Sequence, residues 1–261
     1  MVSIRPLRQS SVRPSPVFLV IVAITAVGGV LAWLAASSIQ PLAYVGVFVF
    51  VIGGWLVSLC LHEFGHAYMA WRYGDHDVAV RGYLTLNPLK YSNPLLSIGL
   101  PLLFIALGGI GLPGGAVYVR TSWMTPWRRT IVALAGAFAN VVLAVVLLVL
   151  VHVLYDPGHA VFWAGVSFLG FLQVTAVVLN LLPIPGLDGY GALEPHLSPE
   201  TQRAVEPAKQ FGFLLLLVVL IAPPLNHWFF SIVYWFFNLS GVPSWLVGWG
   251  VRLTRFWSAW A

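Results

Sequence analysis

Long apolar runs, separated by short polar stretches, are the main pattern along the chain. The first run covers residues 17–36, about 20 residues, which is the length that a helix needs to cross a bilayer. A cleaved signal peptide is the alternative interpretation, but the run is longer than a usual signal-peptide core, and Ala35-Ala36-Ser37 is a poor cleavage site. We therefore expect a retained first transmembrane helix.

Further apolar runs predict five more spans, at 42–73, 130–154, 161–182, 211–222 and 228–249. Tryptophans lie near both ends of the last run, as is common where helices meet the membrane interface. The expected fold is an all-α polytopic membrane protein with about six transmembrane helices. We expect residues 1–16 to form a basic cytosolic tail and 17–261 a single transmembrane domain, whose core lies at about 42–195.

The stretch between the second and third expected spans has a different pattern. Residues 78–86 alternate loosely and are rich in β-forming residues, which predicts short strands or a hairpin. Residues 95–112 are apolar but contain several Gly and Pro residues, and basic residues flank them on both sides. We therefore expect a small β or re-entrant element that dips into the membrane after the second helix.

The composition agrees with a membrane protein. Of the 261 residues, 59% are hydrophobic and 8% are charged, whereas soluble chains carry about 25% charged residues. The mean hydropathy is +0.89 and the pI is about 9.6. The basic residues are scattered between apolar spans, which favours loop charge that orients the chain over binding to nucleic acid. The single cysteine, Cys60, excludes an intrachain disulfide, and we interpret it as a small packing residue.

The distribution of charge predicts an orientation in the membrane. With six crossings, all 13 Lys and Arg residues fall on one side of the membrane. The positive-inside rule places that side in the cytosol. We therefore expect an integral, multi-pass protein of the cell membrane whose N- and C-termini are both cytosolic.

One stretch inside the second expected span carries ionisable groups. Residues 62–66 read His-Glu-Phe-Gly-His. On a helix His62 and His66 lie on one face, about 40° apart, so both rings can reach one metal ion. Glu63 lies one step round the helix, where it can take a proton from a water on the metal. The alternative is a pair of hydrogen-bonded core histidines, which gives the glutamate no role.

A catalytic metal held by two histidines needs a third protein ligand and one open position. Asp188 is the best-placed candidate, because it follows the fourth expected span at a point where Pro183 and Pro185 interrupt the helix. A turn or helix-capping aspartate is the alternative interpretation. The remaining histidines fit surface or interfacial positions better: His76, His152, His159, His196 and His227.

At this point the residues carry a resemblance to a known family. The His-Glu-Phe-Gly-His stretch at the end of a membrane helix, followed by Asn-Leu-Leu-Pro-Ile-Pro-Gly-Leu-Asp-Gly at 180–189, resembles the site-2 protease family of intramembrane zinc metalloproteases. Residues 84–89 and 135–140 also match, and the resemblance covers about residues 45–195.

The resemblance implies a zinc site and a role for each residue in it. It implies one Zn²⁺ per chain, bound by His62, His66 and Asp188, with Glu63 as the general base. It also implies that Asn140 lines the site and steadies the substrate carbonyl. By the residues alone, Asn140 is equally a lone amide that hydrogen-bonds between apolar helices.

The chain departs from this family at several positions. The family often has proline where this chain has Ala137 and Gly186, and His and Asp where it has Tyr91 and Asn93. These departures remove neither a zinc ligand nor the base, so they bear on substrate handling more than on chemistry. No PDZ-like insert fits between the spans and no nucleotide-sensing domain follows the last one, so we expect a minimal core.

The resemblance implies an enzyme that hydrolyses peptide bonds in or near the transmembrane helices of other membrane proteins, as in regulated intramembrane proteolysis. Its expected partners are a transmembrane protein substrate and the lipid bilayer. A substrate helix has all its backbone groups paired, so it must unwind before hydrolysis. Residues 76–118 could then hold it extended by β-addition.

Two other classes of function stay open. A catalytically silent membrane adaptor could keep the zinc site for structure, although such a site has no use for Glu63. A metal transporter is the other class. Transporters often contain internal repeats with matching broken helices, and the chain has no second copy of the His-Glu-Phe-Gly-His span.

Overall fold

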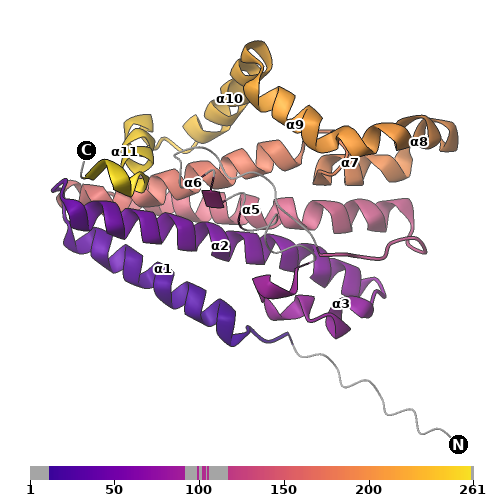
Figure 1. The fold of residues 1–261 in the computed structure, drawn as a ribbon, viewed down its shortest axis with the longest axis horizontal. Coiled ribbons are helices and arrows are strands. Elements are labelled where there is room, and N and C mark those ends of the chain that lie inside the picture. The colour runs from indigo at the N-terminus through magenta and orange to yellow at the C-terminus, as the bar shows by residue number, and fades with distance from the viewer. Residues whose placement is uncertain (1–11, 92–98, 100–101, 104, 106–116, 260–261) are drawn as a thin grey trace, which may run out of the picture.

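The chain folds into a bundle of long helices with shorter helices around its ends (Figure 1). The structure is a computed structural model and describes residues 12–91, 99, 102–103, 105 and 117–259. All regular structure within these residues is helical. The α-helices are α1 Pro16–Leu34, α2 Pro41–Arg72, α3 Asp77–Val80, α5 Pro126–Leu154, α6 Ala160–Asn180, α7 Asp188–Leu193, α8 Pro199–Val205, α9 Gly212–Ile221, α10 Pro223–Asn238 and α11 Ser244–Thr254.

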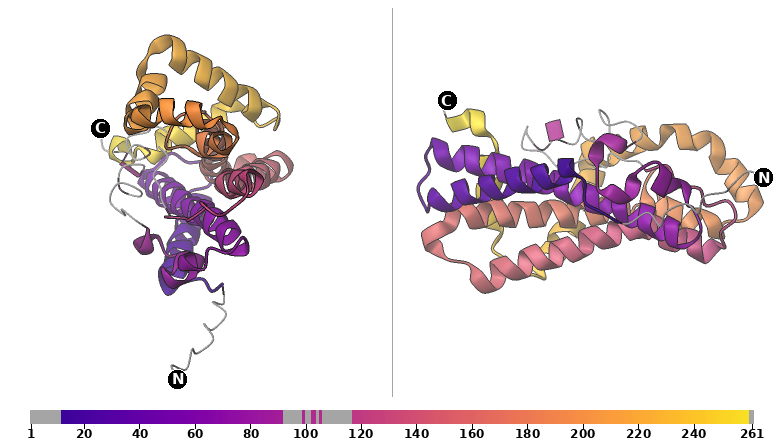
Figure 2. Two further views of the ribbon diagram at one scale, coloured as in Figure 1. Left: turned by 90° about the vertical axis from the view of Figure 1, so that its right-hand side faces the viewer. Right: turned by 90° about the horizontal axis from the view of Figure 1, so that it is seen from below.

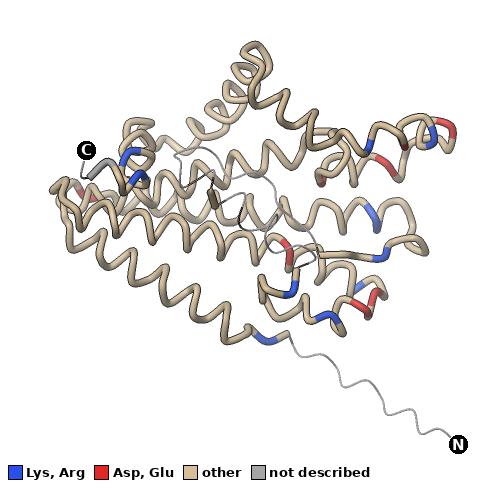
Figure 3. Tube along the Cα trace, viewed as in Figure 1, with Lys and Arg blue, Asp and Glu red and all other residues tan. Residues whose placement is uncertain are grey.

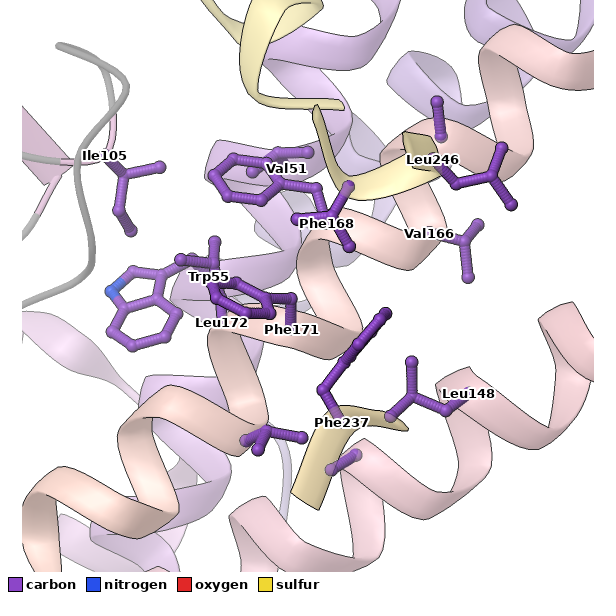
Figure 4. Packing of buried hydrophobic residues seen from close by; sticks show 14 of the residues in the cluster. Val51, Trp55, Ile105, Leu148, Val166, Phe168, Phe171, Leu172, Phe237 and Leu246 are labelled. Atoms are coloured by element: carbon purple, nitrogen blue, oxygen red, sulfur yellow. The ribbon is translucent and has the colours of Figure 1, made fainter. Parts of the chain in front are cut away.

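Helix α6 lies at the centre of the bundle and contacts α2, α5 and α11. In the most apolar window of the span that contains α6, 89% of the residues are buried, against 22% for α1. Phe168, Phe171 and Leu172 of α6 lie in the apolar core (Figure 4). The ring of Phe171 packs edge-on against Phe237 of α10, with 5.6 Å between the ring centroids. A helix that is apolar all round is stable where other helices surround it, and α6 has this position.

Helices α1 and α2 pack closely through glycines. A Cβ atom at Gly46 would lie 2.6 Å from the backbone nitrogen of Ala32, and one at Gly28 would lie 2.9 Å from the Cα atom of Phe50. Small residues allow such close approach between membrane helices. This interface covers the first half of α2, so the second half of α2 is left to contact α5 and α6.

Five segments of the described residues are long and apolar enough to cross a membrane: Pro16–Leu34, Pro41–Arg72, Pro126–Leu154, Pro157–Asn180 and Pro199–Ile221. The sixth span expected at 228–249 is not among them. Its run is divided between α10 and α11, because Gly241 adopts a left-handed φ of +70° and Pro243 follows as the N-cap of α11. The polytopic fold is therefore confirmed, but the number of crossings is not.

The segment after α2 forms helical turns, so the prediction of strands or a hairpin at 78–86 is wrong. Gly82 and Leu86 both adopt left-handed φ values, +80° and +57°, which interrupt an extended chain. Val78 and Leu84 are fully buried in a small apolar cluster against the end of α2. The apolar residues of this segment therefore cover a helix end instead of alternating across a sheet. The turns are α3 and the 3-10 helices Tyr83–Thr85 and Pro88–Lys90.

The expected re-entrant element at 95–112 lies largely outside the described residues. From Val117 the described chain leads to α5 without regular secondary structure.

The described basic residues gather at one end of the bundle, except Arg252 and Arg255 (Figure 3). Helix α1 begins at the basic end, whereas α11 lies at the opposite end (Figures 1 and 2). There the Trp245 ring packs on Tyr155, which follows α5. This arrangement differs from the expected six crossings, in which the chain returns to the side where it began.

The loop between α5 and α6 holds a small polar cluster at the end opposite the basic residues. Asp156 accepts a hydrogen bond from His159 Nδ1 at 2.7 Å and another from the Gly158 N–H at 2.9 Å. The His159 ring stacks on Trp33 near the end of α1, with 3.6 Å between the ring centroids. This cluster ties α1 to the α5–α6 loop.

Candidate metal centre

One face of α2 carries the ionisable residues of the second predicted span. Trp55, His62 and His66 are spaced by seven and four residues, so they lie along one side of the helix. The helices α2 and α5 approach closely here, since a Cβ atom at Gly65 would lie 2.6 Å from the carbonyl oxygen of Ala135. The histidine side chains therefore lie between α2 and its neighbours, within the bundle.

Both histidine rings are held by hydrogen bonds at Nδ1. His66 Nδ1 lies 2.8 Å from the carbonyl oxygen of Val132, which can only accept, so this nitrogen is the donor. His62 Nδ1 lies 3.0 Å from Asn140 Oδ1 and donates to it in the same way. The two Nε2 atoms then carry lone pairs and face each other at 3.1 Å. Outer partners of this kind commonly fix the ring orientation of metal-binding histidines.

Asp188 comes from the chain that follows α6. Helix α6 ends at Asn180, Gly186 adopts a left-handed φ of +97°, and α7 then begins at Asp188. The Thr130 hydroxyl of α5 donates to the carbonyl oxygen of Ala192 at 2.8 Å, which holds α7 against α5. The unwound chain thus brings a carboxylate to face the second half of α2.

The three side chains form the one group of described residues that could hold a metal ion. Asp188 Oδ2 lies 3.5 Å from His62 Nε2, and Asp188 Oδ1 lies 3.3 Å from His66 Nε2. Tetrahedral zinc with bonds of about 2.0–2.1 Å places its ligand atoms about 3.3 Å apart, so these separations fit zinc. Asp188 Oδ2 is buried without a hydrogen-bond partner, which a cation between the three side chains would satisfy.

The electrostatics of Asp188 reflect this setting. Burial disfavours the charged carboxylate, but positive charge on the His66 and His62 rings, when these are protonated, outweighs burial and holds the pKa of the Asp188 carboxyl below its usual value. A cation between the three side chains would favour the ionised carboxylate in the same way.

Gly136 of α5 makes room for the two imidazoles. A Cβ atom there would collide with His66 Nε2 and would lie 2.7 Å from His62 Nε2. Any larger residue must therefore displace the Nε2 atoms of the candidate metal group. The sequence motif around Gly136 gave no indication of this role.

Glu63 lies beside this group and is not part of it. Its side chain is buried, with 3% of the residue exposed. Glu63 Oε2 accepts a hydrogen bond from the Val117 N–H at 2.9 Å. The segment before α5 therefore orients the carboxylate, and no sequence pattern linked Val117 to Glu63.

A cavity of about 420 Å³ surrounds the three side chains and Glu63. Toward the middle of α2 its wall is largely apolar and includes Trp55, Leu59, Leu179 and Leu216. At the basic end of the bundle its wall includes Thr121, Arg129 and Glu194. The cavity thus joins an apolar half to a polar half across the candidate metal site.

Asn140 lines the cavity and makes a hydrogen bond between helices, which is the alternative that the sequence offered. Its Oδ1 atom accepts the His62 Nδ1 proton, so it orients the His62 ring. Cys60 is fully buried and packs with Phe18 and Leu86. Two of the other histidines lie in contacts away from the group: His159 with Asp156, and His196 with Thr130.

Known proteins match this chain over a range that includes part of the candidate site. The model for "Peptidase family M50" matches residues 48–158, which include His62, Glu63 and His66. The chain is 70% identical over 258 residues to "Putative zinc metalloprotease Rip2" of Mycolicibacterium smegmatis, and the alignment covers 99% of both chains. It is 68% identical over 253 residues to the protein of the same name from Mycobacterium tuberculosis, across 97% of this chain and 98% of that one.

A more distant relative has a similar name. "Putative zinc metalloprotease YwhC" of Bacillus subtilis is 33% identical over 176 residues, which cover 64% of this chain and 78% of the relative. No solved structure matches the chain.

Proposed function

Because the chain belongs to peptidase family M50, we propose that it is an intramembrane zinc metalloprotease that hydrolyses peptide bonds in the transmembrane segments of other membrane proteins. The observation that carries this proposal is the convergence of His62, His66 and Asp188 beside the buried Glu63, among helices long enough to cross a membrane. The names of the relatives support the zinc and protease parts of the proposal.

His62, His66 and Asp188 would hold one zinc ion, with the fourth position left to water or substrate. When bound, zinc supplies Lewis acidity, which makes water more acidic and a peptide carbonyl more electrophilic. Asn140 and the Val132 carbonyl hold the two rings in the tautomer that presents Nε2. Their contribution is to fix the donor atoms before substrate arrives.

Glu63 moves the protons of the reaction. Its Oε2 atom is engaged by the Val117 N–H, so we assign the proton from the attacking water to Oε1. The carboxyl then gives this proton to the nitrogen of the departing amine as the C–N bond breaks. Val117 keeps the carboxylate in one orientation through both steps.

The cavity supports a substrate in extended form. Arg129 and Asn140 both line the cavity, and eleven residues of helix separate them by about 16 Å. This length fits about five residues of extended chain. A transmembrane helix must therefore unwind over a short stretch to reach the site, and the walls of the cavity must replace its lost backbone hydrogen bonds.

The end of the bundle that holds Asp188 would face the cytosol. Most described basic residues lie at this end (Figure 3), and the positive-inside rule places such an end on the cytosolic side. The protein would then cut near the cytosolic leaflet of the cell membrane.

The test compares the wild type with Glu63→Gln in proteoliposomes that contain a fluorescently labelled transmembrane peptide. The variant should keep one zinc per chain, measured by mass spectrometry, because no ligand is lost. Cleavage should fall by about 10²- to 10⁴-fold, the usual contribution of a general base. Equal cleavage by both proteins would exclude the assigned role of Glu63.

The same measurements separate the two other classes of function. An adaptor with a structural zinc site would bind zinc and cleave nothing. A transporter would move zinc across the vesicle membrane, and the Glu63→Gln change would act on zinc flux. The orientation of Glu63 by Val117 favours the protease, because neither other class needs a poised carboxylate beside the metal.

A further inference from the structure

Two buried tryptophans have an indole N–H with no hydrogen-bond partner. Trp55 of α2 is 4% exposed and Trp163 of α6 is 5% exposed, and Nε1 is unpaired in both. A buried donor without a partner is unfavourable and uncommon in native proteins. Trp55 lines the cavity around the candidate metal site, whereas Trp163 is not among its lining residues. Of the two tryptophans, only Trp55 forms part of the cavity wall.

The place of Trp55 relative to the metal ligands is well defined. It precedes His62 by seven residues on the same face of α2, about 10 Å along the helix axis toward its middle. Figure 4 shows the indole nitrogen on the side of the ring that faces away from Phe171 and Leu172. The apolar part of the ring thus packs in the core while the N–H is directed elsewhere.

Two polar side chains near Trp55 in the helices, Ser58 and Gln173, hydrogen-bond to each other. The Ser58 hydroxyl, which also lines the cavity, donates to the carbonyl oxygen of Trp55 at 2.8 Å. The Ser58 Oγ atom in turn accepts a hydrogen bond from Gln173 Nε2 at 3.1 Å. Neither residue accepts a hydrogen bond from Trp55 Nε1, and Gln173 Oε1 is also buried without a partner.

We propose that Trp55 Nε1 donates a hydrogen bond to a main-chain carbonyl of the bound substrate. The distance of about 10 Å from His62 corresponds to about three residues of extended chain, so the carbonyl belongs to the third residue from the scissile bond on the membrane side. This inference rests on the proposed protease function.

The proposal follows from what an unwound transmembrane segment lacks. Each residue that leaves the helix exposes a carbonyl group that lipid cannot pair. An indole N–H can only donate, so it fits a carbonyl and not an amide N–H. A contact to the main chain does not depend on the substrate side chain. This subsite would therefore fix how far the substrate extends into the cavity without selecting its sequence.

The test compares Trp55→Phe with Trp163→Phe, each in proteoliposomes with a synthetic transmembrane peptide that the wild type cleaves. Both changes remove a buried, unpaired N–H and shrink a core ring by the same amount. We expect kcat/KM to fall about tenfold for Trp55→Phe, the effect of one hydrogen bond, and to change less than twofold for Trp163→Phe. Zinc content should stay at one per chain in both.

A substitution in the substrate separates hydrogen bonding from packing. Thioamides accept hydrogen bonds more weakly than amides, so one thioamide is placed in turn at each carbonyl on the membrane side of the cleaved bond. The wild type should lose activity at the carbonyl of the third residue, and Trp55→Phe should show no further loss there. β-(3-Benzothienyl)alanine at position 55, which keeps the ring shape without the N–H, should behave like Trp55→Phe.

The outcomes distinguish the two proposals. If the wild type cleaves the peptide, Glu63→Gln does not, and Trp55→Phe matches Trp163→Phe, the subsite is excluded and the protease stands. The subsite is also excluded if the benzothienyl variant cleaves at the wild-type rate. If neither the wild type nor Glu63→Gln cleaves any transmembrane peptide, the protease proposal itself fails.

Discussion

Histidine and aspartate side chains meet in two clusters among the described residues, one near each end of the bundle. In the first, His62 and His66 face Asp188 with side-chain exposures of 10–16%. In the second, His159 contacts Asp156 with exposures of 29% and 51%. The first joins residues of α2 to the start of α7, far apart in the sequence, whereas the second lies within one turn of a loop.

The difference shows that residue types alone do not make a metal site. His159 Nδ1 donates a hydrogen bond to Asp156, and the aspartate also accepts one from the Gly158 N–H. The hydrogen bonds of the second cluster are therefore made within the cluster. In the first cluster other residues take up Nδ1 of each ring, and the Nε2 atoms and Asp188 Oδ2 are left facing one another. A cluster that is complete without a cation is a loop contact, and one that is incomplete without it is a candidate metal centre.

The strongest challenge to this comparison replaces one histidine in each cluster. His66→Ala should lower zinc from about one per chain to near zero and abolish cleavage, because two ligands hold zinc poorly. His159→Ala should keep both zinc and activity. Mass spectrometry of the purified proteins gives the zinc content. Zinc loss in His159→Ala, or retention in His66→Ala, would break the distinction between the clusters.

A second pair of changes tests the glycine beside each cluster. Gly136→Ala places a methyl group against both imidazoles and should remove most of the zinc and nearly all activity. Gly158→Ala brings its methyl group 3.2 Å from the Asp156 oxygens, which an exposed loop can relieve by a small shift. This variant should cleave like the wild type. A functional Gly136→Ala protein with full zinc would show that the imidazoles lie elsewhere when zinc is bound.

A smaller effect is expected where a residue orients a ligand without binding metal. Asn140→Ala removes the acceptor for His62 Nδ1. Zinc affinity should fall about 10- to 100-fold, as for other outer-shell changes, and a competing chelator titration measures it. An unchanged affinity together with a raised KM would instead support the substrate contact that the family resemblance implies for Asn140.

The smallest effect concerns the exposed cluster. The hydrogen bond from His159, followed by that from the Gly158 N–H, holds the pKa of the Asp156 carboxyl below its usual value. A lowered pKa means that this contact stabilises the fold above the unfolded-state pKa of about 3.9 and that the stabilisation is lost as the pH falls through the folded-state pKa. Asp156→Asn should therefore have a slightly lower melting temperature than the wild type at pH 7. At strongly acidic pH the two melting temperatures should be equal. The reverse pH trend would contradict this contact.

The sequence predicted the parts of the site that depend on local spacing. His62 and His66 lie one helical turn apart, so their shared face follows from helix geometry alone. The prolines after α6 indicated where the chain would unwind to carry Asp188. Gly136 and Val117 were not predicted, because their roles arise only when α5 and the segment before it pack on α2.

The errors in the fold have a related cause. Residues 78–86 have the composition of strands, but tertiary packing against the end of α2 outweighs that local preference. The run at 228–249 is apolar enough for one span, yet Gly241 turns the chain through a left-handed conformation in its middle. Hydropathy reports which residues avoid water, and a single backbone turn decides whether they form one helix or two.

The wide separation of Asp188 from the two histidines in the sequence sets the order in which the candidate metal centre is assembled during synthesis. His62 and His66 enter the membrane with α2, but Asp188 is translated only after α5 and α6. At about 5–20 residues per second, the intervening 120 or so residues take about 6–24 s to emerge. A nascent chain therefore carries the two histidines of the candidate metal centre without Asp188 during this time, and the proposed zinc site can be completed only after α6 has been made.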